Sequence, residues 1–301
     1  MGVNRPAQQT GQAFAVALGA VALLSIMDAV MKHLVIAIGI IAVSIWRSLA
    51  NLGLSAILYL PHRLRWPDRS TLKIHIARGV VGTVMAFLFF WGIGLVPLAQ
   101  AIALTFIAPL VALVLAGAFL KEQIGPRSIG GSVVAFAGVL VIMFGQARAQ
   151  LGPQVLLGSA AILGSALCYA ANIVIMRRQA LAARPLEINF FQALTVMACW
   201  VVVLPFVGIP ASAGWQWGWV AVAAILSTAG SLLYSWAYAR GEASYLSVTE
   251  YSAFIWASAL GWLVFHEGVS PFTVAGALLI VGGCIIAARR RLAAPPEIDL
   301  T

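Results

Sequence analysis

The sequence predicts an all-α membrane protein with ten transmembrane helices, arranged as two inverted five-helix repeats with both termini in the cytoplasm. Three observations support this fold class: an apolar composition, ten apolar runs of membrane-spanning length, and an internal duplication. Of the 301 residues, 62% are hydrophobic and 9% are charged, whereas a soluble chain carries roughly 25% charged residues. A water-soluble core could not bury so much apolar surface, so the bilayer must be the solvent for most side chains.

Each predicted helix is an apolar run of about 20 residues, the length that crosses a bilayer. Proline and glycine turn signals separate the runs, as at Pro67, Pro97, Pro126, Pro153 and Pro271. The first run is too long for a signal-peptide core and lacks a convincing cleavage site, so we expect it to remain as a span. The predicted spans are residues 13–34, 41–60, 74–95, 99–120, 128–146, 154–178, 188–207, 216–239, 245–265 and 271–288.

Basic residues mark one side of the predicted bundle. All but three of the 18 Lys and Arg residues fall on the side of the N-terminus, and the exceptions are Lys32, Arg47 and Arg148. Because basic loops stay in the cytoplasm, both termini are predicted to be cytoplasmic. The basic residues form short clusters between apolar runs, so the net charge of +9 does not indicate nucleic-acid binding.

The chain also carries an internal duplication. An ungapped shift of 145 positions places Trp91 on Trp236 and brings further pairs into register: Glu122 with Glu267, Pro126 with Pro271, Gly131 with Gly276, and Gly138 with Gly283. Each half holds five spans, an odd number, so the second half enters the membrane inverted. Inverted repeats are typical of secondary transporters, whose substrate site lies near the midplane. The predicted domains are the repeats at 1–150 and 151–291, followed by a cytoplasmic tail at 292–301.

Signatures of common enzymes and metal sites are missing from the sequence. It contains no GxSxG, HExxH, GxxxxGK[ST] or GxGxxG motif, and the missing P-loop argues against direct use of ATP by this chain. Cys168, Cys199 and Cys284 lie singly in apolar runs, which is typical of buried, inert thiols. We therefore expect a protein that is not an enzyme and that uses no cofactor and no metal.

Charged residues inside the predicted spans are the first candidates for a substrate site, because each costs about 2.5–3.5 kcal/mol at the centre of a helix. Asp28 and Glu250 are the predicted polar anchors. An alternative for Asp28 is an i,i+4 ion pair with Lys32 at the outer mouth. Arg47 is expected to be structural, as a partner for backbone carbonyls or for a carboxylate such as Asp28 or Glu250.

Polar and aromatic residues complete the predicted cavity, and other residues are assigned to gating or packing. The cavity is expected to be shaped by Thr105, Tyr169, Asn172, Tyr234 and Tyr251. Trp91 and Trp236 are candidate gates, with anchoring at the membrane edge as the alternative. Structural roles are predicted for Glu122 and Glu267, as caps of the following helices, and for Gly131, Gly138, Gly276 and Gly283, in close helix packing.

Four sequence stretches carry a family resemblance: FLKEQIGPRSIGGSVVAFAGVLVI, VFHEGVSPFTVAGALLIVGGCII, SIMDAVMKHL and IWRSL. With ten spans in two inverted fives, the chain resembles the EamA-type drug/metabolite transporter superfamily over nearly its whole length. The resemblance implies a basket-shaped transporter in the bacterial inner membrane, with spans one, three, four, six, eight and nine around a central cavity. Spans five and ten would be a peripheral support. Members export amino acids and related metabolites, and others move nucleotide sugars or lipophilic cations.

Together these observations predict an exporter of small amphipathic metabolites that works by alternating access. The favoured substrates are large apolar or aromatic amino acids, as in the bacterial aromatic-amino-acid exporter branch (YddG-like). Efflux of lipophilic cationic drugs or of another metabolite, coupled to protons, is the alternative within transport. An intramembrane enzyme and a passive pore are alternatives from other classes. The expected partners are a small solute and the lipid bilayer, without nucleic acid, and the oligomeric state, monomer or homodimer, stays open.

Overall fold

The computed structural model describes residues 7–62, 66–108, 111, 126–148, 152–208, 214–238, 249–250 and 252–288, and every regular element in these ranges is helical. The elements are α1 (Ala7–Ile38), α2 (Ile40–Tyr59), η1 (Leu60–His62), α3 (Arg69–Ile93), α4 (Leu98–Thr105), α6 (Pro126–Arg148), α7 (Pro153–Ala182), α8 (Pro185–Val207), η2 (Gly214–Gln216), α9 (Trp217–Tyr238), α11 (Ser252–Phe265) and α12 (Pro271–Ala288). Glu122, Tyr251 and the predicted tail at 292–301 lie outside the described residues.

Six segments are long and apolar enough to cross a bilayer: Gln12–Ile38, Ile40–His62, Arg69–Ile93, Pro153–Asn172, Leu186–Val207 and Gly214–Tyr234. Shorter apolar helices lie at Phe136–Gly145, Ser252–Phe265 and Pro271–Gly283. The molecule is therefore an all-helical membrane protein in the part that the structure describes, and each predicted span overlaps one of its helices. Ten crossings stay a prediction, because half of 99–120 and the start of 245–265 lie outside that part.

Local sequence signals set the helix ends. Proline stands in the first turn of α7 and α8, where its missing N–H costs nothing. Asp68 caps α3: the Ser70 hydroxyl and the Thr71 amide donate to its carboxylate, and these hydrogen bonds lower the Asp68 pKa from 3.8 to about 2. Gly39 joins α1 to α2 as a single residue with a φ of 81°. That left-handed conformation suits glycine and allows the sharp reversal.

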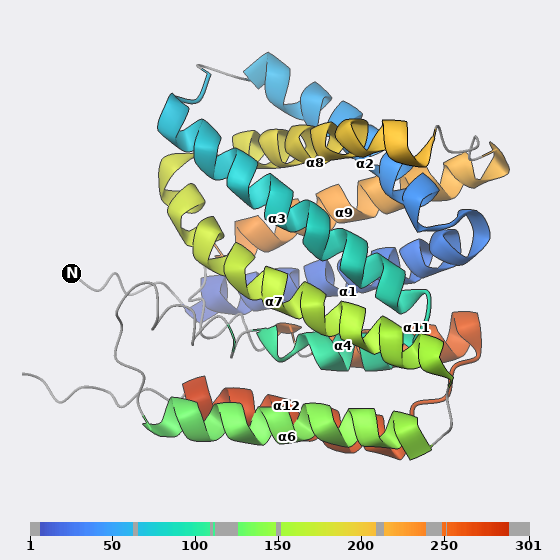
Figure 1. The fold of residues 1–301 in the computed structure, drawn as a ribbon. Helices are drawn as coiled ribbons and strands as arrows, with labels where there is room; N and C mark the ends of the chain where they lie inside the picture. Colours follow the sequence, from blue (N-terminus) through green and yellow to red (C-terminus); the bar gives the residue numbers. More distant parts are fainter. Residues whose placement is uncertain are drawn as a thin grey trace, which may run out of the picture.

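Helices α6 and α12 form a separate layer along one side of the bundle, with α4 between them and the remaining helices (Figure 1). They run antiparallel, because Gly138 lies against Ile280 while the later Gly145 lies against the earlier Phe272. Glycine is required at the crossing: a Cβ on Gly138 would stand 2.6 Å from the carbonyl oxygen of Gly276, and the reverse distance is also 2.6 Å. This contact supports the packing role expected for these two glycines, which stays a prediction.

The helix contacts repeat when the chain is shifted by 145 positions, which carries α1, α2, α3 and α6 onto α7, α8, α9 and α12. α1 packs on α9, and the shifted counterparts α7 and α3 also pack on each other. α2–α9 and α8–α3 correspond in the same way, while α2–α8 and α6–α12 pair equivalent helices. At one such crossing Ala13 packs on Ala237, and at the other their counterparts Gly158 and Gly92 meet. This pattern supports the predicted duplication of the fold, and the inverted relation between the two halves stays a prediction.

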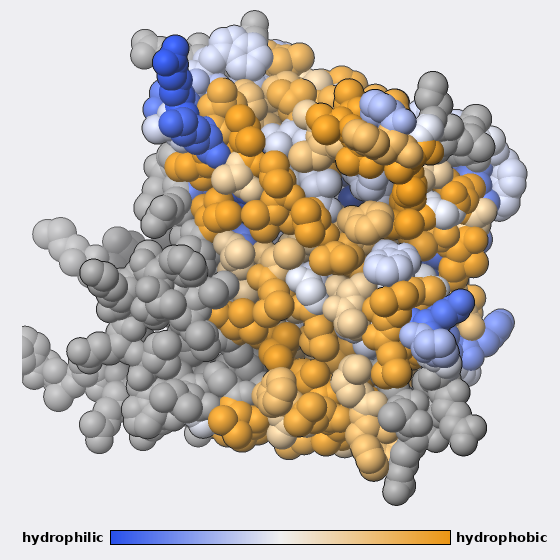
Figure 2. Space-filling model, viewed as in Figure 1, coloured by the Kyte–Doolittle hydropathy of each residue, from blue (hydrophilic) through white to orange (hydrophobic). Residues whose placement is uncertain are grey.

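The outer surface of the bundle is apolar. Large hydrophobic side chains are exposed on several helices, including Ile57 at 71%, Phe206 at 86% and Leu278 at 69%. Figure 2 shows hydrophobic residues across the middle of one face, with hydrophilic ones toward the helix ends. Such a band is typical of a protein surrounded by lipid.

Candidate functional site

Two charged side chains lie near each other on α1 and α2. Asp28 and Arg47 are both half-buried, and their charges interact electrostatically although no direct ion pair joins them. The guanidinium carbon of Arg47 lies 4.9 Å from the ring centroid of Phe90 on α3, and its buried Nε has no hydrogen-bond partner. Of the two carboxylates that the sequence suggests for Arg47, the structure brings Asp28 near. A carboxylate beside a guanidinium with an unused donor can receive both charged groups of a zwitterion.

Lys32 does not form the i,i+4 ion pair with Asp28 that the sequence suggested as an alternative. Its ammonium group pairs with the carboxylate of Glu267 and donates to the Val96 carbonyl at 2.7 Å. The other oxygen of Glu267 accepts the Leu98 N–H at 2.9 Å. Glu267 therefore caps α4, and not the helix that follows it in the chain. These contacts join α1, the α3–α4 turn and the α11–α12 turn at one end of the bundle.

The second predicted anchor, Glu250, lies just before α11 and accepts a hydrogen bond from Tyr234 on α9 at 2.5 Å. Two residues predicted to line the cavity are thus in direct contact. Thr105, at the end of α4, donates its hydroxyl proton to the Ile102 carbonyl of its own helix at 2.7 Å. The hydroxyl of Thr105 is thus bonded within its own helix, and the substrate contact predicted for Thr105 stays a prediction.

The candidate gates occupy different surroundings. Trp91 stacks on Phe87 at a centroid distance of 6.2 Å, and Phe87 in turn lies 6.0 Å from Trp200. Trp236 is 39% exposed on α9. A gating role for either tryptophan stays a prediction.

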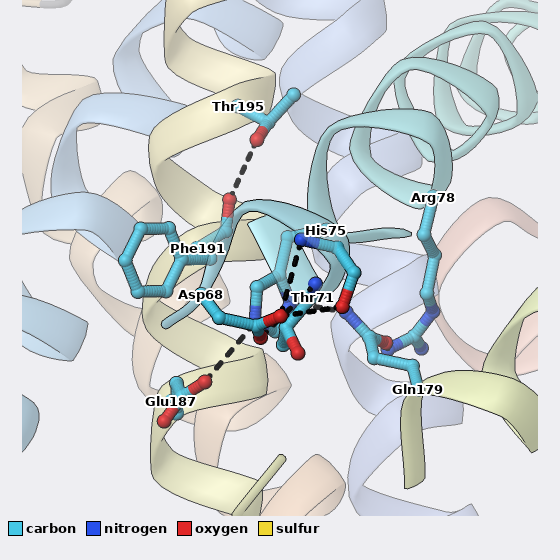
Figure 3. Close-up of polar contacts among 9 residues, drawn as sticks. Asp68, Thr71, His75, Arg78, Gln179, Glu187, Phe191 and Thr195 are labelled. Atoms are coloured by element: carbon cyan, nitrogen blue, oxygen red, sulfur yellow. Dashed lines mark hydrogen bonds and ion pairs between the residues drawn. The ribbon is translucent and has the colours of Figure 1, made fainter. Parts of the chain in front are cut away.

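A chain of polar side chains, missed by sequence reasoning, connects α3, α7 and α8 (Figure 3). Arg78 donates from Nε to Asn172 Oδ1 at 3.0 Å and from Nη1 to Gln179 Oε1 at 2.5 Å. Gln179 Nε2 donates to His75 Nδ1 at 2.6 Å, and His75 Nε2–H donates to Glu187 Oε1 at 3.2 Å. Because arginine only donates, it fixes the amide of Gln179 and hence the tautomer of His75.

The polar chain is well buried. His75 and Gln179 are 0% exposed and Asn172 is 5% exposed. The imidazole of His75 stacks on Phe191 at 4.9 Å with an interplanar angle of 11°. Tyr169 lies close enough to Arg78 for an electrostatic interaction. The structure therefore brings the predicted pair Tyr169 and Asn172 to Arg78.

One signal in the sequence could have pointed to this series of hydrogen-bonded polar side chains. His75 and Arg78 fall one turn apart inside the predicted span 74–95, where a polar pair is costly. Their partners, Gln179 and Glu187, come from two other helices, and hydropathy alone does not give the register between helices.

Comparisons with known proteins agree on the family. The model of the EamA-like transporter family matches residues 12–144 and again residues 156–289. Similar curated proteins include a pseudopaline exporter of Pseudomonas aeruginosa, 27% identical over 74% of this chain and 78% of that protein. An aromatic amino acid exporter of Ancylobacter novellus is 27% identical over 82% of this chain and 83% of its own. A riboflavin transporter of Rhizobium johnstonii is 24% identical over 81% and 76%.

A solved crystal structure supports the fold as well. It matches with a TM-score of 0.56 at 19% sequence identity, covering 94% of this chain and 100% of the other. At this identity the likeness concerns the arrangement of the helices alone.

Proposed function

Because the chain belongs to the EamA-like transporter family, we propose that it is a secondary transporter of the bacterial inner membrane that exports small amphipathic metabolites, with large apolar or aromatic amino acids favoured. The relatives are named for the transport of pseudopaline, aromatic amino acids and riboflavin. They agree on transport and differ in substrate, so the choice of substrate depends on the side chains of this molecule.

The observation that carries the substrate proposal is the pair of opposite charges on α1 and α2. Asp28 and Arg47 interact without a direct ion pair, and Arg47 Nε is buried without a partner. An amino acid carries an ammonium and a carboxylate group on the same carbon, so one substrate molecule can satisfy both residues. Each charged contact made away from bulk water is stronger than it would be at a surface.

A lipophilic cation fits the same residues less well. The positive charge of Arg47 repels a cation that approaches Asp28. The carboxylate of Glu250 already accepts a hydrogen bond from Tyr234. A site with a carboxylate and a guanidinium attracts a zwitterion more strongly than a molecule with only a positive charge. Drug efflux is therefore the competing outcome of the test below.

Transport by alternating access follows from the proposed architecture of two inverted repeats, residues 1–150 and 151–291. The double family match and the repeated helix contacts support this division. The distribution of Lys and Arg supports cytoplasmic termini. Lys32 and Glu267 belong to different repeats, so their ion pair is a contact that rocking of one repeat against the other would break and remake.

Counterflow in proteoliposomes tests the function. Labelled phenylalanine is supplied outside, and unlabelled phenylalanine, leucine or tetraphenylphosphonium is loaded inside, with no ion gradient. We expect transient accumulation with internal phenylalanine or leucine and none with tetraphenylphosphonium. Accumulation driven by the phosphonium ion alone would replace the proposal with drug efflux. Flux that neither saturates nor shows counterflow would indicate a pore.

A further inference from the structure

We propose that Arg78 is a second recognition site, which binds the carboxylate of the solute before or after it contacts Asp28 and Arg47. This inference deepens the proposed function and rests on it for the identity of the solute. The first support is that the charge of Arg78 is not balanced by a neighbouring acid. Its two hydrogen bonds go to the neutral amide oxygens of Asn172 and Gln179, and no acidic side chain pairs with it among the described residues.

The orientation of Arg78 is fixed by neutral amide groups, which accept its hydrogen bonds without neutralising its charge. Gln179 presents its oxygen to Arg78 because its amide nitrogen donates to His75, and His75 donates in turn to Glu187. The carboxylate of Glu187 therefore binds His75, and both His75 and Gln179 stand between it and Arg78 in the series of hydrogen bonds. A guanidinium has five N–H donors, and these two hydrogen bonds use the Nε donor and one Nη1 donor. A fixed guanidinium with unused donors suits a carboxylate.

The fold itself does not require polar residues at this place. A shift of 145 positions carries His75 onto Val220, Arg78 onto Ala223, Asn172 onto Met27 and Gln179 onto Leu34. All four counterparts are buried: Val220, Ala223 and Leu34 at 0% exposure and Met27 at 8%. The same helix crossing is thus packed with apolar side chains in one half and with a polar chain in the other. Since buried charges are retained at a cost, the difference indicates a role in function.

A second uncommitted polar group lies beside Asn172. A Cβ on Gly82 would stand 2.4 Å from Gln192 Nε2 and 3.6 Å from Asn172 Nδ2, so the bare glycine brings both amides to the same place on α3. Gln192 Oε1 is buried and has no hydrogen-bond partner. Gln192 is the repeat counterpart of Arg47. An unused acceptor on a residue near Asn172, which itself holds Arg78, fits a ligand that also donates a hydrogen bond.

The Arg78 site is distinct from the site at Arg47. Arg47 lies over Phe90, which is twelve residues after Arg78 on α3, and twelve residues of α-helix span about 18 Å. The two positions on α3 are thus about three helical turns apart, so we treat Arg78 as a separate contact for the solute. Arg78 is closer to the start of α3, the end that carries the basic residues Arg69 and Lys73, so on the proposed topology it is the first of the two that a cytoplasmic solute meets.

Calorimetric titration of the purified full-length protein with 3-phenylpropionate, a carboxylate without an ammonium group, tests the site. Arg78→Ala copies the residue at the repeat counterpart, and we expect it to weaken binding at least about tenfold. Lys73→Gln is the matched control, because it removes one charge from the exposed side of the same helix, and we expect a change below about twofold. Arg47→Gln should leave a binding event that depends on Arg78.

Several outcomes overturn the inference: no binding of 3-phenylpropionate to the wild type, equal binding by Arg78→Ala, or binding lost in Arg47→Gln alone. If Arg78→Ala does not fold, Arg78→Lys keeps the charge without the planar fork and should lower affinity by a smaller factor. Inorganic phosphate and chloride, titrated in parallel, separate a carboxylate site from a general anion site. Arg78-dependent binding without amino-acid counterflow would contradict the proposed substrate but leave the anion site. Amino-acid counterflow by the wild type, together with unchanged binding of 3-phenylpropionate to Arg78→Ala, would support the proposed substrate and contradict the Arg78 site.

Discussion

At the scale of single residues, the molecule treats its intramembrane charges in three ways. Lys32 is paired with an acid and capped by a carbonyl, so its charge is neutralised within the protein. Arg78 is held by neutral amides, and Arg47 interacts with Asp28 at a distance without direct pairing. A charge in the bilayer that is left incompletely paired is expensive and therefore marks a site of function. Asp28, Arg47 and Arg78 meet that criterion, which supports the solute-binding roles that we propose for them, whereas Lys32 does not.

The first prediction concerns Asp28. We expect Asp28→Asn to lower phenylalanine counterflow by about 30-fold, because losing one partner of a desolvated charge contact costs about 2 kcal/mol. Folded yield should be unchanged, since no ion pair of the protein is broken. Asp68→Asn is the control, because it also removes a carboxylate, from an exposed position where asparagine is an equally good helix cap. Equal loss of transport and yield in Asp28→Asn would make Asp28 structural.

At the scale of helices, the ion pair between Lys32 and Glu267 fastens α1 to two turns of the bundle. Glu267→Gln keeps an oxygen for the Leu98 N–H but leaves Lys32, 3% exposed, without its counter-charge. We expect a loss of about 3 kcal/mol in the free energy of unfolding, measured by thermal or denaturant unfolding in detergent. The double variant Lys32→Met/Glu267→Gln should recover more than half of that loss. An unchanged stability of Glu267→Gln would show that the pair contributes nothing to packing.

The crossing of α6 and α12 allows a matched comparison of two glycines on one helix. Gly138→Ala would press a methyl group against the backbone of Gly276, whereas a Cβ at Gly130 meets nothing within 4 Å. We expect Gly138→Ala to destabilise the protein by about 1–3 kcal/mol and Gly130→Ala to be neutral or stabilising. Thermal unfolding of the two variants side by side measures the difference, and equal midpoints would contradict the packing described for this crossing.

At the scale of the whole molecule, the proposed topology puts the α2–α3 loop in the cytoplasm and the α11–α12 loop outside. Arg69 and Ser270 are exposed positions in or next to these loops. In a variant without the native cysteines, we expect Ser270→Cys to react with a membrane-impermeant maleimide in intact cells. Arg69→Cys should react only after permeabilisation. Labelling of both from the same side would exclude an inverted arrangement of the two repeats.

Much of the helical layout could be read from the sequence, because a membrane-spanning helix is a local property of about 20 apolar residues. The duplication was readable too, since Trp, Glu and Pro are scarce enough here for their register to carry information. The partners of the charged residues could not be read from the sequence. The sequence suggests an ion pair of Lys32 with Asp28 as an alternative, whereas Lys32 pairs with Glu267, far along the chain. Asp28 and Arg47 stand out in the sequence because they are charged residues inside predicted spans. The hydrogen-bonded series from Arg78 to Glu187 depends on the register of three helices, which the sequence does not give.

The central claim is that Asp28 and Arg47 select a zwitterion, and competition for labelled phenylalanine counterflow tests it most directly. Three competitors of nearly equal size are compared: phenylalanine, phenylalanine amide, which lacks the carboxylate, and 3-phenylpropionate, which lacks the ammonium group. We predict that phenylalanine competes at least about tenfold better than either analogue, because each analogue leaves one charged residue unsatisfied. If the amide competes as well as phenylalanine, the site recognises a cation, and the account given for Arg47 is wrong.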